Sequence, residues 1–353
     1  MKINKKVAVI GTVILFFILF TGIIFIKIGL SEEPVKEPIA SYVVENTPTI
    51  SHTFTPLPTL EITPTPIDYD SIAGLTEGQV YPDKLVEDKT KNVLIIGEDK
   101  VAGLYDTLGI MNIDKKNKKV KIIMIPRDTY IQYNKKVIHY LELAGKSGDP
   151  AFYKINCAHN IGPIMKYKSK FSQYSISFLA DVIKEVFSIE VDDYVKVNTE
   201  GFVDIVDLFG GVDIEVPYNM NFDDPFQNLS IHLNKGFQHL DGKQAEGFVR
   251  FRQGYDEKNV LISYGDTERK KNQITFIKAF INQHATLENI TKIPGLLKSM
   301  NKNVKTSVGV GDVLMSYTGI LKDVVINKYK IDSITIQGKS EMRNGTYYQL
   351  IGN

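Results

Sequence analysis

The sequence predicts an α/β protein in which helices cover both faces of a central mixed β-sheet, an αβα sandwich, preceded by one membrane-spanning helix. Short apolar or β-branched runs of strand length alternate with stretches of helical periodicity from about Leu85 onward. The chain has 353 residues, of which 43% are hydrophobic, and this is enough for a large domain with a substantial core.

The amino-terminal segment predicts the membrane anchor. Lys2, Lys5 and Lys6 precede 20 uncharged residues at 7–26, which are enough to cross a bilayer as a helix. Because lysines favour the cytoplasmic side, we expect the rest of the chain to lie outside the membrane. A cleaved signal peptide is the alternative, but its apolar core would be shorter, and no small-x-small cleavage site follows the run.

A linker rich in proline and threonine follows the anchor. Residues 31–70 contain seven Pro and seven Thr, and such a composition is typical of an extended, semi-rigid stalk that buries no core. We therefore expect three regions: a cytoplasmic tip and transmembrane anchor at 1–30, an extracytoplasmic linker at 31–84 and a folded domain at 85–353.

The elements of the domain follow from local patterns. Apolar and β-branched runs predict strands at 92–97, 108–113, 119–125, 193–198, 212–216 and near 333–336. Apolar residues at helical spacing predict helices at 175–187, 200–209, 241–249 and 266–282, and two more in the tail after Leu287. Gly210-Gly211 ends the second of these helices, and an Asp-Gly turn precedes the third.

Composition excludes several classes of protein. The net charge of +1 provides no field that would attract nucleic acid, and the sequence has no helix-turn-helix or basic stripe. Cys157 is the single cysteine, which excludes an internal disulfide framework and a cysteine metal cluster. The six histidines include no His-Glu-x-x-His pair, so a zinc hydrolase is not expected.

Arginine is scarce and concentrated in a few motifs. Only five of the 42 basic residues are arginine: Arg127, Arg250, Arg252, Arg269 and Arg343. A guanidinium is a rigid fork that binds phosphate or carboxylate through two parallel hydrogen bonds, whereas lysine is a mobile point charge. The pattern indicates that arginine is kept where lysine would not serve. Chance placement on the surface is the alternative, and it suits Arg343.

Arg250 and Arg252 allow more than one arrangement. In an extended segment, residues two apart point to the same side, so the two guanidiniums would crowd together and favour an anion between them. If a helix continues through this segment, the two side chains diverge by roughly 200° and the argument weakens. Two solvated surface arginines are the third option.

The segment 265–273 predicts a helix start that favours anions. Asp266 is a suitable N-cap, and Asp266, Arg269 and Gln273 share one helical face. The free N–H groups of a helix N-terminus attract negative charge, and an arginine and a glutamine there add directed donors. An ordinary capped and solvated helix start is an equally open alternative.

Two further segments place polar residues at the ends of predicted strands. Pro126 ends the strand at 119–125 and leaves Arg127 and Asp128 at the carboxyl edge of the sheet, where α/β proteins commonly bind ligands. Asp99 follows the first strand and Asp106 opens the second, so their carboxylates could converge as ligands of Mg²⁺ that is shared with substrate phosphates. Each aspartate could instead only form a turn.

The chain resembles the LytR-CpsA-Psr family of bacterial cell-wall enzymes from about Lys91 to the C-terminus. Six stretches in the family's order carry the resemblance: NVLIIGED (92–99), DTLGIMNIDKKNKKVKIIMIPRDTYI (106–131), KINCAHNIGP (154–163), DDYVKVNTEGFVDIVDLFGGVDIEVP (192–217), LNKGFQHLDGKQAEGFVRFR (233–252) and GDTERKKNQ (265–273).

The resemblance implies a phosphotransferase on the outer face of the membrane of a Gram-positive bacterium. Such an enzyme would transfer a glycopolymer (teichoic acid, capsule or similar) from a polyprenyl-pyrophosphate carrier to a peptidoglycan sugar hydroxyl and form a phosphodiester. A non-catalytic sensor or scaffold that binds polyprenyl phosphate, and a pyrophosphatase acting on the same lipid, are the alternatives. No nucleic-acid partner is expected.

The resemblance also implies roles for individual residues. Asp99 and Asp106 would hold Mg²⁺ or Mn²⁺, and Asp106 or Asp266 would accept the proton of the attacking hydroxyl. The arginines that bind the pyrophosphate and act in catalysis would be Arg127, Arg252 and Arg269. Arg250, Gln273 and Asp128 would support the site.

This sequence departs from the family's usual pattern at four positions. Leu104 and Asn272 stand where the family usually has arginine, and Lys100 stands where an arginine often follows the first metal aspartate. Pro163 replaces the second glycine of a Gly-Gly pair. The loss of cations at a pyrophosphate site would weaken substrate binding or change its preference, and nearby lysines would compensate only as point charges.

Overall fold

The computed structural model describes residues 67–98, 103–225, 229–284, 302–308, 324 and 326–351, without the side chains of Asp106, Asp266 and Thr267. The expected anchor, most of the expected linker, Asp99 and about half of the tail after Leu287 lie outside this part of the chain. Among the helices that the structure describes, none combines the length and the apolar character needed to traverse a bilayer.

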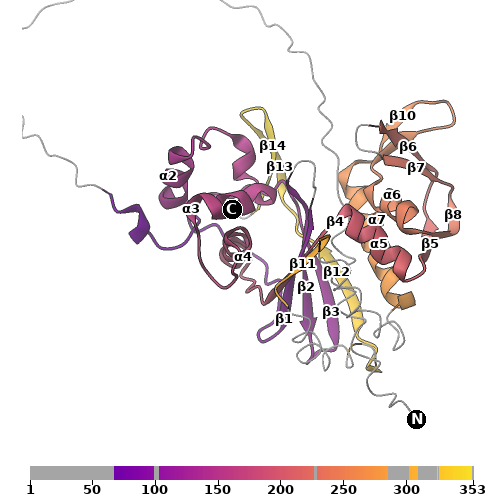
Figure 1. The fold of residues 1–353 in the computed structure, drawn as a ribbon, viewed down its shortest axis with the longest axis horizontal. Helices are drawn as coiled ribbons and strands as arrows, with labels where there is room; N and C mark the ends of the chain where they lie inside the picture. Colours follow the sequence, from indigo (N-terminus) through magenta and orange to yellow (C-terminus); the bar gives the residue numbers. More distant parts are fainter. Residues whose placement is uncertain are drawn as a thin grey trace, which may run out of the picture.

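A six-stranded mixed sheet forms the centre of the domain (Figure 1). Its strand order is β11-β4-β1-β2-β3-β12, with β1 parallel to β4 and β3 parallel to β12, whereas the other three pairings are antiparallel. The strands are β1 (Lys91–Glu98), β2 (Tyr105–Asp114), β3 (Lys119–Ile125), β4 (Asp193–Asn198), β11 (Val304–Thr306) and β12 (Lys330–Thr335). The prediction of a central mixed sheet is confirmed.

Helices lie on both sides of this sheet, as Figure 1 shows. One side carries α2 (Lys135–Leu143), α3 (Ile161–Met165), α4 (Tyr174–Phe187) and the 3₁₀ turns η2 (Pro150–Tyr153) and η3 (Ile155–Asn160). The other side carries α5 (Thr199–Leu208), α6 (Gly242–Arg250) and α7 (Gly265–His284). A hydrophobic core lies on each side of the sheet, and alternate residues of β1 point into the two cores. Leu94 and Ile96 pack with α4, whereas Val93 and Ile95 pack with α5 and α6.

Polar side chains determine where the helices on the second side begin. Asn198 ends β4 and accepts a hydrogen bond from the N–H of Gly201 at 3.0 Å, which caps α5. Asp241 and Gln244 form a reciprocal capping box at the start of α6. Each cap contributes about 1 kcal/mol of stability, because it satisfies N–H groups that the helix leaves open.

The described residues also form four two-stranded sheets outside the central sheet, and the sequence patterns predicted little of them. They are β5 (Val212–Val216) with β8 (Gly236–Leu240), β6 (Met220–Asp224) with β7 (Leu229–Leu233), β9 (Gln253–Tyr255) with β10 (Leu261–Ser263), and β13 (Lys339–Arg343) with β14 (Thr346–Leu350). The strand expected near 333–336 is present as β12, but it is not the last strand, because β13 and β14 follow it. Asn344-Gly345, both with positive φ, form their turn and are the usual sequence signal for such a hairpin.

The folded part of the chain begins before residue 85, the expected start of the domain. Leu75 is buried, and its N–H and that of Thr76 both donate to the carboxylate of Glu185 on α4. The short turn η1 (Tyr69–Ser71) also lies against α2, where Tyr140 donates to Asp70. The last part of the segment assigned to the linker therefore packs on the domain.

Candidate functional site

The carboxyl ends of four strands meet at one edge of the sheet. β1, β3, β4 and β12 run in the same direction, and β2 begins at the edge where they end. Leu108 lies opposite Ile125, the last residue of β3, so the turn that carries Arg127 follows at the edge where β2 begins. Gly97 pairs with Thr107 and Glu98 with Tyr105, which leaves Asp106 as the extra residue of a β-bulge.

The turn after β3 places Arg127 and Asp128 at this edge, as predicted. The hydroxyl of Thr129 donates to the carbonyl of Pro126 at 2.7 Å and fixes the turn. The Nε of Arg127 lies 3.4 Å from the Asp128 carboxylate, which also accepts a hydrogen bond from Lys154 at 2.7 Å. Asp128 therefore holds two cations together, and Lys154, which the sequence reasoning did not select, belongs to the same cluster.

Arg250 and Arg252 do not form the crowded extended pair that was one of the options. α6 continues through Arg250, and Phe251 then turns into an extended conformation. Arg250 is 4% exposed and donates to Glu246 one turn earlier, which is equally buried. The carbonyl of Arg252 instead accepts the N–H groups of Tyr264 at 2.7 Å and Gly265 at 3.0 Å, which ties Arg252 to the start of α7.

The first turns of α7 carry the other predicted residues of the site. Arg269 and Gln273 are 2% and 3% exposed, and the Gln273 amide lies 3.5 Å from the carbonyl of Val249 at the end of α6. Both face inward from one side of the helix, as predicted. α7 begins at Gly265, so Asp266 lies inside the first turn and is not the N-cap that the sequence suggested.

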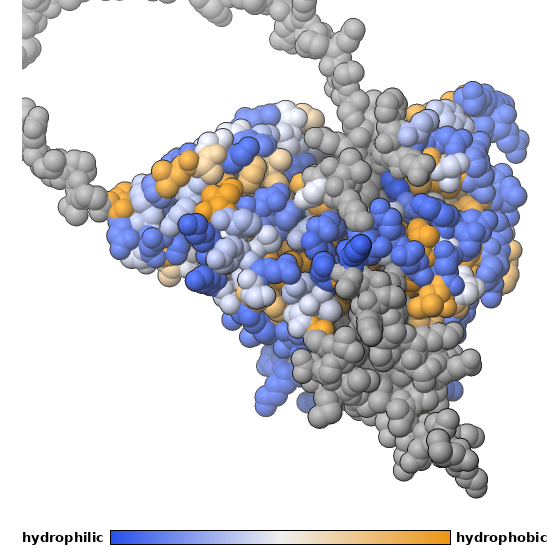
Figure 2. All heavy atoms as spheres, in the orientation of Figure 1, coloured by the Kyte–Doolittle hydropathy of each residue, from blue (hydrophilic) through white to orange (hydrophobic). Residues whose placement is uncertain are grey.

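A cavity of about 320 Å³ lies between α7 and the sheet edge. Lys270, Lys271 and Ile274 of α7 line one side of it, and Thr335 and Gln349 line the other. The N–H of Gln349 donates to the carbonyl of Asp128 at 2.8 Å, so the same cavity borders the turn after β3. The Arg252 segment is therefore hydrogen-bonded to the start of α7, and the turn with Arg127 is bonded to Gln349, which borders the same cavity as α7. Figure 2 shows strongly hydrophilic residues gathered between the two helical layers.

The departures from the family's usual pattern have structural explanations where they are described. Leu104 packs against the core on the α4 side. Asn272 is buried and lies 3.4 Å from the hydroxyl of Tyr218, to which it donates. Pro163 occupies the first turn of α3, where a backbone N–H has no helical partner to lose. Lys100 lies outside the described residues.

A cluster around Tyr105 was missed by the sequence reasoning. The ring of Tyr105 stacks on His159 with 3.7 Å between centroids, and Lys196 lies 5.4 Å above the same ring and pairs with Glu98. The His159 ring nitrogens contact the carbonyls of Gly103 at 2.9 Å and Asn156. His159 lies within the motif KINCAHNIGP, so this motif was the signal that the sequence offered. The contact of His159 with the carbonyl of Gly103 positions the segment just before Asp106.

Burial makes His159 a source of pH-dependent stability. Desolvation lowers the pKa of His159 from 6.5 to about 4, although its two carbonyl contacts favour the charged form. Between pH 6.5 and 4, His159 therefore binds a proton in the unfolded chain but not in the folded chain. The stabilisation is complete above pH 6.5 and is lost as the pH falls toward 4, by about 3 kcal/mol in all.

We expect His159→Gln to flatten this dependence of the unfolding free energy on pH. Urea denaturation at several pH values between 4 and 7 measures it, because the midpoint reports the free energy. His239→Gln is the control, since His239 lies exposed beside Asp213. An equally steep decline in His159→Gln and the unmodified chain would contradict this assignment.

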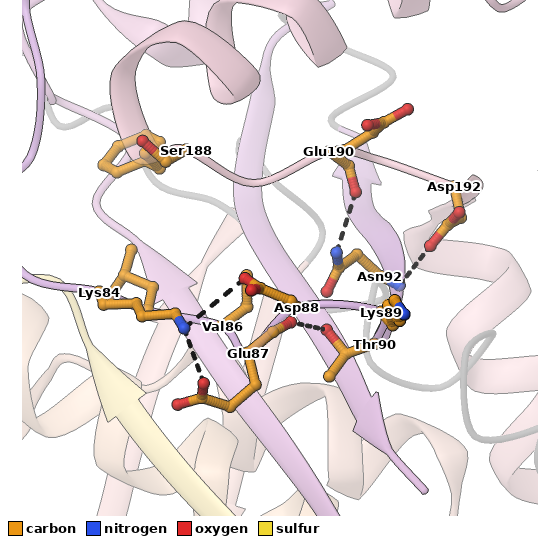
Figure 3. A pocket seen from close by; sticks show the side chains of 12 residues that line it. Lys84, Val86, Glu87, Asp88, Lys89, Thr90, Asn92, Ser188, Glu190 and Asp192 are labelled. Atoms are coloured by element: carbon orange, nitrogen blue, oxygen red, sulfur yellow. Dashed lines mark hydrogen bonds and ion pairs between the residues drawn. The ribbon is translucent and has the colours of Figure 1, made fainter. Parts of the chain in front are cut away.

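A second hollow, of about 480 Å³, lies at the opposite end of β1 and is shown in Figure 3. Its polar groups satisfy one another: Asp192 accepts the N–H of Asn92 at 2.7 Å, and the Asn92 amide donates to the carbonyl of Glu190. Lys84 pairs with Glu87. The contacts of Asn92 hold the start of β1 against the segment that follows α4. The hollow contains none of the predicted site residues.

The αβα layering is shared with a family whose named members are cell-wall transferases. The LytR_cpsA_psr family model matches residues 71–353, and the chain belongs to this family. The predictions of the family and of an enzyme of its transferase class are confirmed.

Individual members of the family can be compared with this chain. It is 27% identical to the polyisoprenyl-teichoic acid–peptidoglycan teichoic acid transferase TagV of Bacillus subtilis (strain 168), over 79% of this chain and 66% of TagV. It is also 27% identical to the transferase TagU of Bacillus licheniformis, over 73% of this chain and 71% of TagU. The crystal structure of B. subtilis TagV superimposes with a TM-score of 0.51 and 26% identity, covering 76% of this chain and 92% of that one.

Proposed function

We propose that this chain transfers a glycopolymer from a polyprenyl-pyrophosphate carrier to a sugar hydroxyl of peptidoglycan and joins the two through a phosphodiester. The observation that carries the proposal is the meeting of three arginine-bearing segments at one sheet edge: the turn with Arg127, the α6–α7 junction with Arg252 and the first turns of α7 with Arg269. A pyrophosphate presents several charged oxygens, and guanidinium forks match their geometry.

The relatives support this choice of substrate. TagV and TagU are named as transferases that move teichoic acid from a polyisoprenyl carrier to peptidoglycan. The motifs that carry the arginines lie within the part of the chain that matches the family. The anchor expected at residues 7–26 would hold the domain at the outer face of the membrane, where both substrates are found.

The reaction requires little covalent chemistry from the protein. The acceptor oxygen would attack the phosphorus that bears the polymer, and the new P–O bond would form as the bond to the bridging oxygen breaks. Polyprenyl phosphate would leave with the electrons of that bond, and the acceptor proton would pass to a carboxylate, for which Asp266 and Asp106 are the candidates. Arg127, Arg252 and Arg269 would stabilise charge on the phosphate oxygens.

Asp99 and Asp106 would hold Mg²⁺ or Mn²⁺ at the same edge. Within the described ranges, no three or more His, Cys, Asp or Glu side chains are grouped so that they could hold a metal ion. Phosphate oxygens and water would complete the shell, which is how Mg²⁺ commonly binds, and the position of Asp106 in the bulge at the edge where β3 ends supports such sharing. The ion would neutralise charge on the two phosphates.

Lipid extraction and product analysis test the proposal. We expect the purified full chain to contain polyprenyl phosphate, because the proposed site retains this leaving group, and to form a phosphodiester between polymer and peptidoglycan when it is given both substrates. Mass spectrometry of the lipid extract and of the digested peptidoglycan measures the two outcomes. Release of polymer phosphate to water alone would identify a pyrophosphatase. Bound lipid without turnover would identify a sensor or scaffold.

A further inference from the structure

A cavity of about 640 Å³ lies beside the arginine-bearing segments and is assigned to none of the roles above. The hairpin β6–β7 forms one wall, residues 255–258 after β9 form another, and Tyr264 immediately before α7 completes it. It lies at the outer end of the α5–α7 side, where Figure 1 shows β6, β7 and β10 together.

Aromatic faces and amide groups line this cavity. Tyr255 is 38% exposed and stacks on Phe222 with 6.4 Å between ring centroids. Tyr264 stacks on Tyr218 at 4.4 Å and 16°, so its ring is held rigidly. Asn219, Asn221 and Asn234 also line the cavity. Flat rings beside amide donors and acceptors suit a sugar, whose C–H face packs on an aromatic ring while its hydroxyls form hydrogen bonds.

The charge of the cavity favours the uncharged acceptor glycan of the proposed reaction over the anionic donor polymer. Asp256 and Glu257 line it together with Lys258 and His232, so the cavity carries one surplus negative charge when the histidine is neutral. A teichoic acid carries a phosphate in each repeat and would be repelled, whereas an uncharged glycan would not be. The cavity that borders Lys270 and Lys271, on the other side of the site, has the opposite charge.

The aromatic wall is connected directly to the arginine-bearing segments. The N–H of Tyr264 donates to the carbonyl of Arg252 at 2.7 Å, and the next residue begins α7. Asn272, on the same helix as Arg269, donates to the hydroxyl of Tyr218 beneath Tyr264. A sugar seated on Tyr264 would therefore lie one residue from the helix start that carries Asp266.

From these contacts we propose that this cavity binds the acceptor, an uncharged stretch of N-acetylhexosamine glycan, and presents its hydroxyl to the phosphorus. The assignment rests on the proposed transferase function and adds the position of the acceptor. Tyr255 and Tyr264 provide the stacking platform. The surplus of negative charge keeps the anionic donor polymer on the lysine-lined side.

Binding of a neutral oligosaccharide tests the assignment without any lipid substrate. An N-acetylglucosamine tetramer is titrated into the full chain in detergent, and calorimetry measures its dissociation constant. We expect binding to weaken about threefold to tenfold in Tyr255→Ala, because a ring contact is lost, and to persist in Tyr255→Phe, which keeps the ring. Tyr347→Ala is the matched control, since Tyr347 is an exposed tyrosine on β14, away from the cavity.

The transfer assay provides a second measurement. Tyr255→Ala should raise the KM for the acceptor by the same factor and leave the KM for the lipid donor unchanged. Equal tetramer binding by Tyr255→Ala and the unmodified chain, no binding to either, or displacement of the tetramer by a glycerol-phosphate oligomer would overturn the assignment. If the tetramer binds at Tyr255 but lipid pyrophosphate is never consumed, the cavity is a glycan site and the proposed transferase function is wrong.

Discussion

Arg127→Ala is expected to lower kcat/KM for glycopolymer transfer by about 100- to 1000-fold, the usual effect of removing one directed donor from a developing phosphate charge. Arg127 is part of a turn fixed by Thr129 and belongs to neither hydrophobic core, so its removal leaves the apolar packing of both cores unchanged. Arg252→Ala should act in the same way. The measurement is the rate of lipid-pyrophosphate consumption with a peptidoglycan acceptor.

Two further variants sharpen this experiment. Arg127→Lys keeps the charge but not the fork, and we expect it to restore only a small part of the rate. Arg343→Ala is the matched control, because Arg343 pairs with Glu341 in the β13–β14 hairpin and lies over the ring of Tyr130. Wild-type rates in both Arg127→Ala and Arg252→Ala would show that the arginines do not act on the substrate.

Removal of divalent metal is expected to stop turnover, with a loss of about 1000-fold or more, because the charge on two adjacent phosphates would be left without its cation. Chelation with EDTA should abolish transfer, and added Mg²⁺ or Mn²⁺ should restore it. Asp106→Asn should imitate chelation, since it keeps the volume of the side chain and removes its charge.

Binding of Mn²⁺, followed by electron paramagnetic resonance, separates a metal role from a structural one. We expect Asp106→Asn to weaken Mn²⁺ binding in the presence of polyprenyl phosphate. Asp213→Asn is the control, because Asp213 lies exposed on β5 beside His239. Rates that are unchanged in EDTA would remove Asp99 and Asp106 from the metal role and leave the arginines as the source of the charge stabilisation.

Much of the sheet and of the helical layers was predictable because each element has a strong local pattern. The apolar runs that became β1, β2 and β3 are central strands buried on both faces, so apolar and β-branched residues predominate in them. α4 was equally clear, since its apolar residues repeat at helical spacing and nine of its residues are buried.

The hairpins β6–β7 and β9–β10 were not predictable in the same way. β10 is fully exposed, and β6 alternates buried with exposed residues over only five positions, so neither pattern exceeds that of an ordinary loop. Their pairing depends on contacts with α6 and with each other, which the local sequence does not contain. The proposed glycan cavity lies between these two hairpins and for that reason was not expected.

Arg250 and Arg252 looked alike in the sequence, but the tertiary structure gives them different environments. Arg250 and Arg252 stand two residues apart in one motif, yet α6 ends between them. Glu246, one turn before Arg250, is its ion-pair partner, and this spacing of four was the signal that sequence reasoning overlooked. The role of Arg250 at the pyrophosphate stays a prediction.

The sequence by itself determined the family, the central strands and the identity of the scarce arginines, because motifs and periodicity are local properties of the chain. Only the tertiary structure decided which of these residues share a site. The bulge at Asp106 depends on the register of β1 and β2, the turn after Pro126 is bonded to Gln349 through Asp128, and Arg252 is bonded to the start of α7. Such bonds depend on register and packing, and no single segment specifies them alone.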